Sequence, residues 1–125
     1  MDDSTLVEQF EDSTLPSLPH RDHVRLVFLY ARSDGAETAY DRIRTGLINY
    51  TAARGSSEHF HETRTWAWAV LIANAAADFY GDFDAFWAQH PEFDRRDLLG
   101  DYFSETLLTS DAARAAVQQP DLKPL

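Results

Sequence analysis

A helical repeat of apolar residues between Asp34 and Gly55 constrains the fold more than any other feature of the sequence. Apolar side chains in this stretch recur three and four residues apart, as on the buried face of an amphipathic helix. They are Ala36, Ala39, Tyr40, Ile43, Leu47 and Tyr50. Asp34 followed by Glu37 resembles a capping box, with Asp in place of Ser or Thr. The pattern predicts one helix from Asp34 to Arg54, ended by Gly55.

The residues before this helix are expected to form a second, buried helix. The run "HVRLVFLYA" within Pro19–Arg32 is apolar nearly all round, and a buried strand is the alternative. A proline near its start and "SDG" after it favour the helix. Residues 1–16 are acidic and are expected either to make a short helix around Leu6 and Phe10 or to fray. Residues 17–125 are expected to form the helical domain.

A third helix is expected over residues 59–80, with Ser56 or Ser57 as its cap. Trp66 and Trp68 in this segment lie about 200° apart around a helix axis, at about 100° per residue. Because opposite sides of the helix are then apolar, it is predicted to be the central helix of the fold.

Shorter helical segments are expected in the last third of the chain. The stretch "GDFDAFWAQHP" predicts a helix that is capped by Asp82 and ends before Pro91. "DLLGDYF" predicts a short helix or a 3₁₀ turn, and Ser110 is expected to begin a last helix over "DAARAAV". No stretch shows the regular alternation of apolar and polar residues, flanked by hairpin turns, that is typical of β-strands. The expected fold is all-α, a compact single-domain bundle of about five or six helices.

The composition narrows the function and the setting of the chain. Its formal net charge of −10 disfavours nucleic acid and anionic membranes as partners, because both repel an acidic surface. No cysteine is present, which excludes disulfides, zinc–thiolate sites and thiol catalysis. The start "MDDSTLVEQFEDST" lacks the basic and apolar regions of a secretory signal, and the longest apolar run is too short for a bilayer. We therefore expect a cytoplasmic protein.

Four of the five histidines lie in two short stretches, "PHRDH" and "EHFHET". His20 and His23 are three residues apart and share a face if the helix already includes His20. His59 and Glu62 are spaced in the same way, whereas His61 points about 100° away from Glu62. If the first and third long helices run parallel, both stretches lie at the same end of the bundle. Either His59 with Glu62 or His61 then faces the site, and we favour Glu62 with His61 at its rim.

Acid–base catalysis on a small molecule is the first functional hypothesis for this cluster. Its candidate catalytic residues are Glu62, His61, His23 and His20. The aromatic residues that would wall a pocket for a flat, aromatic substrate are Trp66, Trp68, Tyr30, Trp87 and Tyr102. Arg64 or Arg25 would pair with a substrate carboxylate through a bidentate fork. In this hypothesis the enzyme needs no cofactor.

Two further hypotheses come from other classes of protein. In the second, a divalent transition metal such as zinc, iron or nickel is held by His20, His23, His59 and Glu62. In the third, the chain is a non-catalytic module whose helix ends bind a partner or another copy of the chain, as in a homodimer. Polar residues at helix starts also need no function, because they satisfy free amides and the helix dipole. No Ser-His-Asp order, phosphate-binding loop or dinucleotide-binding turn supports a hydrolase, kinase or dehydrogenase.

The stretches "PHRDHVRLVFLYAR", "FHETRTWAWAVLIA" and "DYFSETLLTSDAARAAVQQPDLKPL" resemble a group of short bacterial proteins. These proteins pair an H-x-x-H helix start with a Y/F-H-E-T motif. The resemblance covers about residues 20–120 and includes His20, His23, His61, Glu62 and Thr63.

The chain also looks like small cyclases of natural-product pathways, which join an aryl-ethylamine to an aldehyde in the Pictet–Spengler reaction. This resemblance implies that Glu62 is the base that removes the ring proton during rearomatisation. It further implies that a histidine assists imine formation, that the tryptophans stack against the indole, and that no cofactor is needed.

Overall fold

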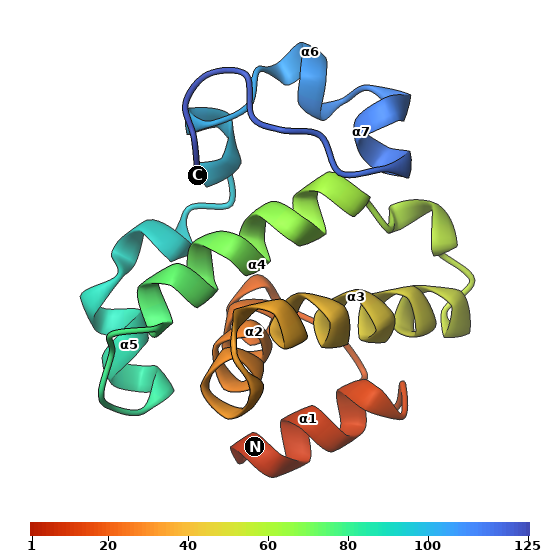
Figure 1. Cartoon of the computed structure of the whole chain (residues 1–125). Coiled ribbons are helices and arrows are strands. Elements are labelled where there is room, and N and C mark those ends of the chain that lie inside the picture. Colours follow the sequence, from red (N-terminus) through yellow and green to blue (C-terminus); the bar gives the residue numbers. More distant parts are fainter.

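The computed structural model describes residues 1–125 and contains helices but no strands (Figure 1). Three long helices form its centre: α2 (His20–Asp34), α3 (Ala36–Ala53) and α4 (Glu62–Ala76). α4 packs against both α2 and α3, and residues from Leu98 to the C-terminus lie on its other side, whereas α5 (Phe83–Gln89) packs against α2. The all-α expectation is confirmed, with seven α-helices in place of five or six. No helix is long and apolar enough to cross a membrane.

The N-terminal segment is an ordered part of the core. Helix α1 (Asp3–Glu11) lies along α3, on the side away from α4 (Figure 1). Leu6 and Phe10 are fully buried, and the Phe10 ring occupies the place where a side chain at Gly46 would be. Of the two alternatives for this segment, the helix around Leu6 and Phe10 is therefore correct. Its burial also depends on the absence of a side chain in the middle of α3.

The break between α2 and α3 differs from the predicted capping box. Asp34 is the last residue of α2, and a single residue, Gly35, separates the two helices. Gly35 has a φ of 86°, in the region that favours glycine, and provides no side-chain cap. The Asp34 carboxylate instead accepts a hydrogen bond from Arg42 at 2.6 Å. The capping-box prediction was wrong because the turn takes place one residue later than the box requires.

The start of α4 was also placed wrongly by the sequence pattern. Residues Ser57–His59 form a separate 3₁₀ turn, and α4 begins only at Glu62. The cap is His61, whose Nδ1 accepts the backbone N–H of Arg64 at 3.1 Å, and not Ser56 or Ser57. The helix ends at Ala76, four residues before the predicted end. An imidazole therefore performs here the role that the sequence rules assign to a hydroxyl or carboxylate.

Short elements make up the C-terminal third. They are α5 (Phe83–Gln89), 3₁₀ turns at Pro91–Asp94 and Leu98–Asp101, α6 (Glu105–Leu108) and α7 (Asp111–Ala115). The predicted cap of α5, Asp82, is confirmed, and Ser110, expected to begin the last helix, is the cap of α7. The 3₁₀ alternative for "DLLGDYF" is confirmed as well. Helix α6, capped by Ser104, was not predicted.

Thr63, in the first turn of α4, fixes the chain that follows α7. This side chain is fully buried, donates a hydrogen bond to the carbonyl of Ala116 and accepts one from the backbone N–H of Gln118, both at 3.0 Å. Further on, the N–H of Leu122 donates to the carbonyl of Tyr102. The final residues 119–125, called the tail below, are thereby held close to α4.

Thr63→Val is expected to lower the free energy of unfolding by about 1–3 kcal/mol, because the carbonyl of Ala116 and the N–H of Gln118 lose their partner. The shape of the side chain hardly changes. Urea denaturation of both forms measures the difference. Thr109→Val is the matched control, since Thr109 is exposed and bonds only within its own helix turn. Equal small effects at the two positions would contradict the role of Thr63.

Candidate functional site

The two histidine stretches do not meet at one end of the bundle. Figure 1 shows α2 almost along its axis while α4 runs across the view, so the two helices cross. The rings of His20 and Trp68 meet in a T-shaped arrangement, with 4.9 Å between their centroids, and Nε2 of His20 donates to the carbonyl of Phe93 at 2.7 Å. The start of α2 therefore meets the middle of α4, in place of the parallel arrangement expected from the sequence.

His23 lies one turn further along α2, and its ring centroid is 6.4 Å from that of His20. The two histidines thus share a face, as their spacing predicts. The Nε2 atom of His23 is buried and has no hydrogen-bond partner. Burial, with a smaller contribution from the charge of His20, lowers the pKa of His23 to about 4. At neutral pH His23 is therefore uncharged, and its Nε2 atom is enclosed.

His61 uses both ring nitrogens in structural contacts. Because Nδ1 accepts the N–H of Arg64, Nε2 carries the proton and donates it to the carbonyl of Leu108 in α6, at 2.9 Å. The ring is 6% exposed, and burial lowers its pKa. His61 thus begins α4 and fastens α6 to it, which leaves no free nitrogen for proton transfer.

Glu62 is held by two side chains of α3. The Nε atom of Arg44 lies 2.9 Å from both carboxylate oxygens, and its second guanidinium nitrogen lies 2.8 Å from Oε1. The Tyr40 hydroxyl donates to Oε2 at 3.1 Å. Burial and the neighbouring carboxylate raise the pKa of Tyr40, so that it stays a donor. With its side chain only 11% exposed, Glu62 is a largely buried residue whose carboxylate is held in a fixed orientation.

His59 lies apart from Glu62, contrary to the predicted pair. It belongs to the 3₁₀ turn before α4, its side chain is 74% exposed, and its nearest charged neighbour is Glu58 at 3.8 Å. The helical spacing that would join His59 to Glu62 does not exist, because Phe60 and His61 are not helical. No group of three or more His, Asp or Glu side chains is close enough to hold a metal ion. The four residues of the metal hypothesis are therefore not assembled into one ligand set.

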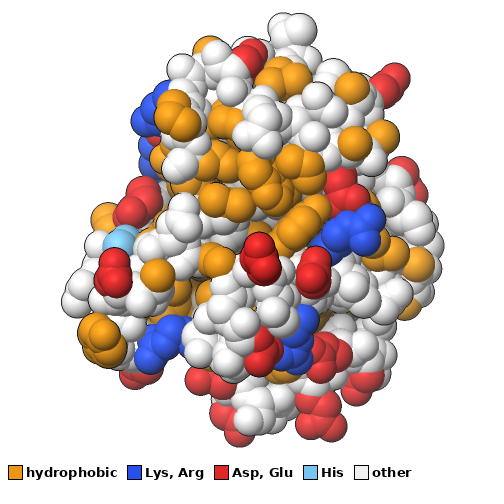
Figure 2. Space-filling model, viewed as in Figure 1, with side chains coloured by type: hydrophobic (Ala, Val, Ile, Leu, Met, Phe, Trp, Pro, Cys, Tyr) orange, Lys and Arg blue, Asp and Glu red, His pale blue; other side chains and the backbone are white.

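Trp66 is the one predicted aromatic residue that lines a surface groove. This groove, called the Trp66 groove below, has a volume of about 460 Å³ and runs between α4 and the tail. It is lined by Trp66, Val70 and residues 119–125. Figure 2 shows hydrophobic side chains gathered in a band along α4, beneath the C-terminal elements. Because Trp66 follows Glu62 by four residues, both lie on the same side of α4.

The other predicted aromatic residues pack elsewhere. Trp68 is 7% exposed and lies against His20. The Tyr30 hydroxyl is buried and donates to Glu11 at 2.9 Å. Trp87 packs on the ring of Phe83, and Tyr102 lies under the ammonium group of Lys123. These four side chains come from four different segments of the chain and do not wall one pocket with Trp66.

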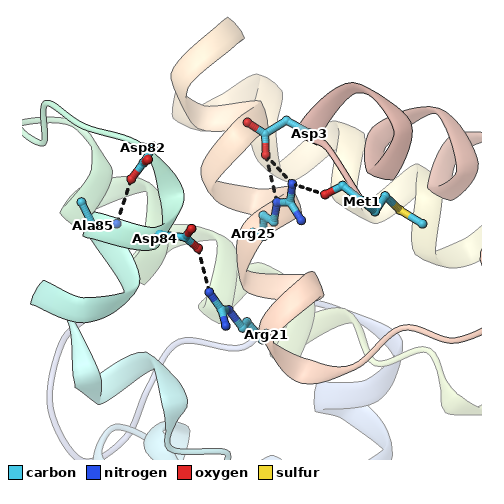
Figure 3. Close-up of polar contacts among 7 residues, drawn as sticks. All are labelled: Met1, Asp3, Arg21, Arg25, Asp82, Asp84 and Ala85. Atoms are coloured by element: carbon cyan, nitrogen blue, oxygen red, sulfur yellow. Dashed lines mark hydrogen bonds and ion pairs between the residues drawn. The ribbon is translucent and has the colours of Figure 1, made fainter.

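The two candidate carboxylate-binding arginines have different surroundings. Figure 3 shows Arg25 bound to Asp3, at 2.7 and 2.9 Å, and to the carbonyl of Met1. In the same view Arg21 pairs with Asp84, beside the Asp82 cap of α5. Arg64 forms neither an ion pair nor a side-chain hydrogen bond. Of the two candidates, only Arg64 has its guanidinium free for a ligand.

Tyr40, Arg44 and the tail are parts of the site that sequence reasoning missed. Tyr40 and Arg44 lie four residues apart on α3, a spacing that puts a hydroxyl and a guanidinium on one face. That spacing was the only available signal, and it does not say which residue of another helix they meet.

Comparison with protein-family models, curated proteins and solved structures finds no match for this chain.

Proposed function

We propose that this protein is a small-molecule enzyme that binds an aromatic amine in the Trp66 groove and uses Glu62 as its base. The observation that carries the proposal is a carboxylate in a fixed orientation, on a side chain that is 11% exposed, one helical turn away from the residue Trp66 that lines an aromatic groove. A carboxylate attracts an ammonium or iminium group, and an indole face stacks on a flat ring. An aryl-ethylamine contains both features.

The reaction proposed is a Pictet–Spengler cyclisation of an aryl-ethylamine with an aldehyde. The amine and the aldehyde condense to an iminium ion and release water. A carbon of the aromatic ring then attacks the iminium carbon, which forms a new carbon–carbon bond and leaves a ring proton to be removed. Glu62 accepts that proton and restores the aromatic ring. As proposed, the reaction uses no cofactor, and the net result is one cyclic amine and one water.

Arg44 and Tyr40 act as positioning residues in this proposal. Their four contacts leave the carboxylate of Glu62 little freedom to rotate, and so a substrate proton meets it in one geometry. The hydrogen bonds that Arg44 donates to Glu62 also raise the pKa of Arg44. Arg44 therefore stays charged beside the carboxylate. That charge offsets part of the cost of an anion beside an apolar groove.

Glu62→Gln is expected to lower the rate of cyclisation by about 100-fold, because it keeps the shape of the side chain and removes the base. The measurement is mass-spectrometric detection of cyclised product from tryptamine or phenylethylamines with a panel of aldehydes. Glu58→Gln is the control, since Glu58 is a nearby glutamate with a 72% exposed side chain. Product formed equally fast by both variants would rule out Glu62 as the base. Product at only the buffer rate with every pair would contradict the cyclase.

A further inference from the structure

Two arginines without carboxylate partners line one pocket of this acidic protein. Five others pair with Asp or Glu; they are Arg21, Arg25, Arg42, Arg44 and Arg95. Arg64 of α4 and Arg96, between the two later 3₁₀ turns, form no ion pair and no side-chain hydrogen bond, and both line the same pocket. In a chain with a formal net charge of −10, two free guanidinium groups at one cavity need an explanation.

This cavity, called the Arg64 pocket below, has a volume of about 420 Å³ and lies between α4, the Leu98–Asp101 turn and α6. Its apolar walls are Leu99, Phe103, Leu108 and Leu122. It therefore has room for the body of a small organic molecule as well as for a charged group. Leu122 also lines the Trp66 groove, so the tail separates the two cavities.

The Arg64 pocket is lined by two arginines and two acidic residues, and no ion pair neutralises either arginine. Of its two acidic lining residues, Asp97 already accepts from Arg95 at 3.3 Å, and Glu105 lies in the first turn of α6. Arg114 adds a further positive charge near Arg64. Burial is the larger cause that lowers the pKa of Arg64, and the charge of Arg114 is the smaller one. Arg114 itself donates to the carbonyl of Glu58, so its charge is not neutralised by a carboxylate. A bound carboxylate would relieve this repulsion.

We propose that the Arg64 pocket binds a small carboxylate with an apolar body, which Arg64 and Arg96 hold through charge-assisted hydrogen bonds. The site is separate from the proposed catalytic one, because Glu62 and Arg64 lie about 200° apart around α4. One small substrate cannot reach both sides of the helix. The inference therefore stands whether or not Glu62 is a base.

The test is a titration of the ¹⁵N-labelled protein with phenylacetate and, as its neutral counterpart, phenylacetamide. We expect phenylacetate to shift the amide signals of Gly100, Leu108 and Thr109, and to bind at least about tenfold more tightly than phenylacetamide. Arg64→Met and Arg96→Met should each weaken phenylacetate binding about tenfold and leave phenylacetamide unaffected.

Arg21→Met is the matched control, because Arg21 is an exposed arginine that pairs with Asp84 (Figure 3) and lines no part of this pocket. It should leave binding of phenylacetate unchanged. Equal binding of the two probes, equal loss in all three variants, or shifts confined to the Trp66 groove would each overturn the proposal. Thermal unfolding of the variants confirms that they are folded.

Discussion

Phe10→Ala is expected to lower the free energy of unfolding by about 3–5 kcal/mol, the range typical of a fully buried phenylalanine. The ring of Phe10 is completely enclosed, lies 6.2 Å from the ring of Tyr50 and fills the space above Gly46. Its loss would leave a cavity between α1 and α3. Urea denaturation followed by circular dichroism measures the change. A loss below about 1 kcal/mol, as at a surface position, would mean that α1 is not part of the core.

Gly46→Ala provides the paired measurement. A methyl group at position 46 would overlap the Phe10 ring, so this variant alone should lose about 1–3 kcal/mol. In the Phe10→Ala background the methyl group has room, and the same change should be neutral or stabilising. Gly100→Ala is the control, since a side chain there meets nothing within 4 Å. Additive losses in the double variant would contradict the contact.

Acidification from pH 7 to pH 4 should weaken the fold through His23 by up to about 3 kcal/mol. The pKa of His23 is about 4 in the folded protein, because its ring is buried, and 6.5 is its ordinary value. Between these values the unfolded chain binds a proton that the folded chain does not, so stability falls as the pH falls. Above pH 6.5 both states are neutral, and this penalty disappears.

His23→Leu isolates this effect. Its unfolding free energy should be close to that of the parent protein at pH 7, because the buried Nε2 atom makes no hydrogen bond that could be lost. At pH 5 the variant should be the more stable of the two. Subtracting the two pH profiles cancels the contribution of His61, whose pKa is also lowered by burial, and of the acidic side chains. Parallel profiles would show that His23 is accessible to protons in the folded state.

The helices were predictable where their apolar pattern is regular, as in α3, and where an ordinary cap stands in the sequence, as at Asp82 and Ser110. Helix starts were missed where a tertiary contact decides them. His61 caps α4 because its other nitrogen is fixed by the carbonyl of Leu108, 47 residues away. Helix propensities contain no information about such a partner.

The candidate site was predicted in part. Glu62 and Trp66 do lie on one side of α4, because a spacing of four residues requires it. The prediction that α2 and α4 run parallel was wrong. The angle at which these helices cross depends on how side chains such as His20 and Trp68 pack, and the short loops between the helices do not determine it. Arg44 was not foreseen as the partner of Glu62, since an ion pair between two helices depends on their packing.

The most direct test of the proposed site is a titration with tryptamine in which the indole N–H signals of the three tryptophans are followed by NMR. Trp66 lines the groove, whereas Trp68 and Trp87 pack elsewhere. We expect a saturable shift of the Trp66 signal, little change in the other two, and weaker binding in Glu62→Gln. A Trp66 signal that stays in place while tryptamine binds, or shifts only at Trp68 or Trp87, would contradict a site formed by Glu62 and Trp66.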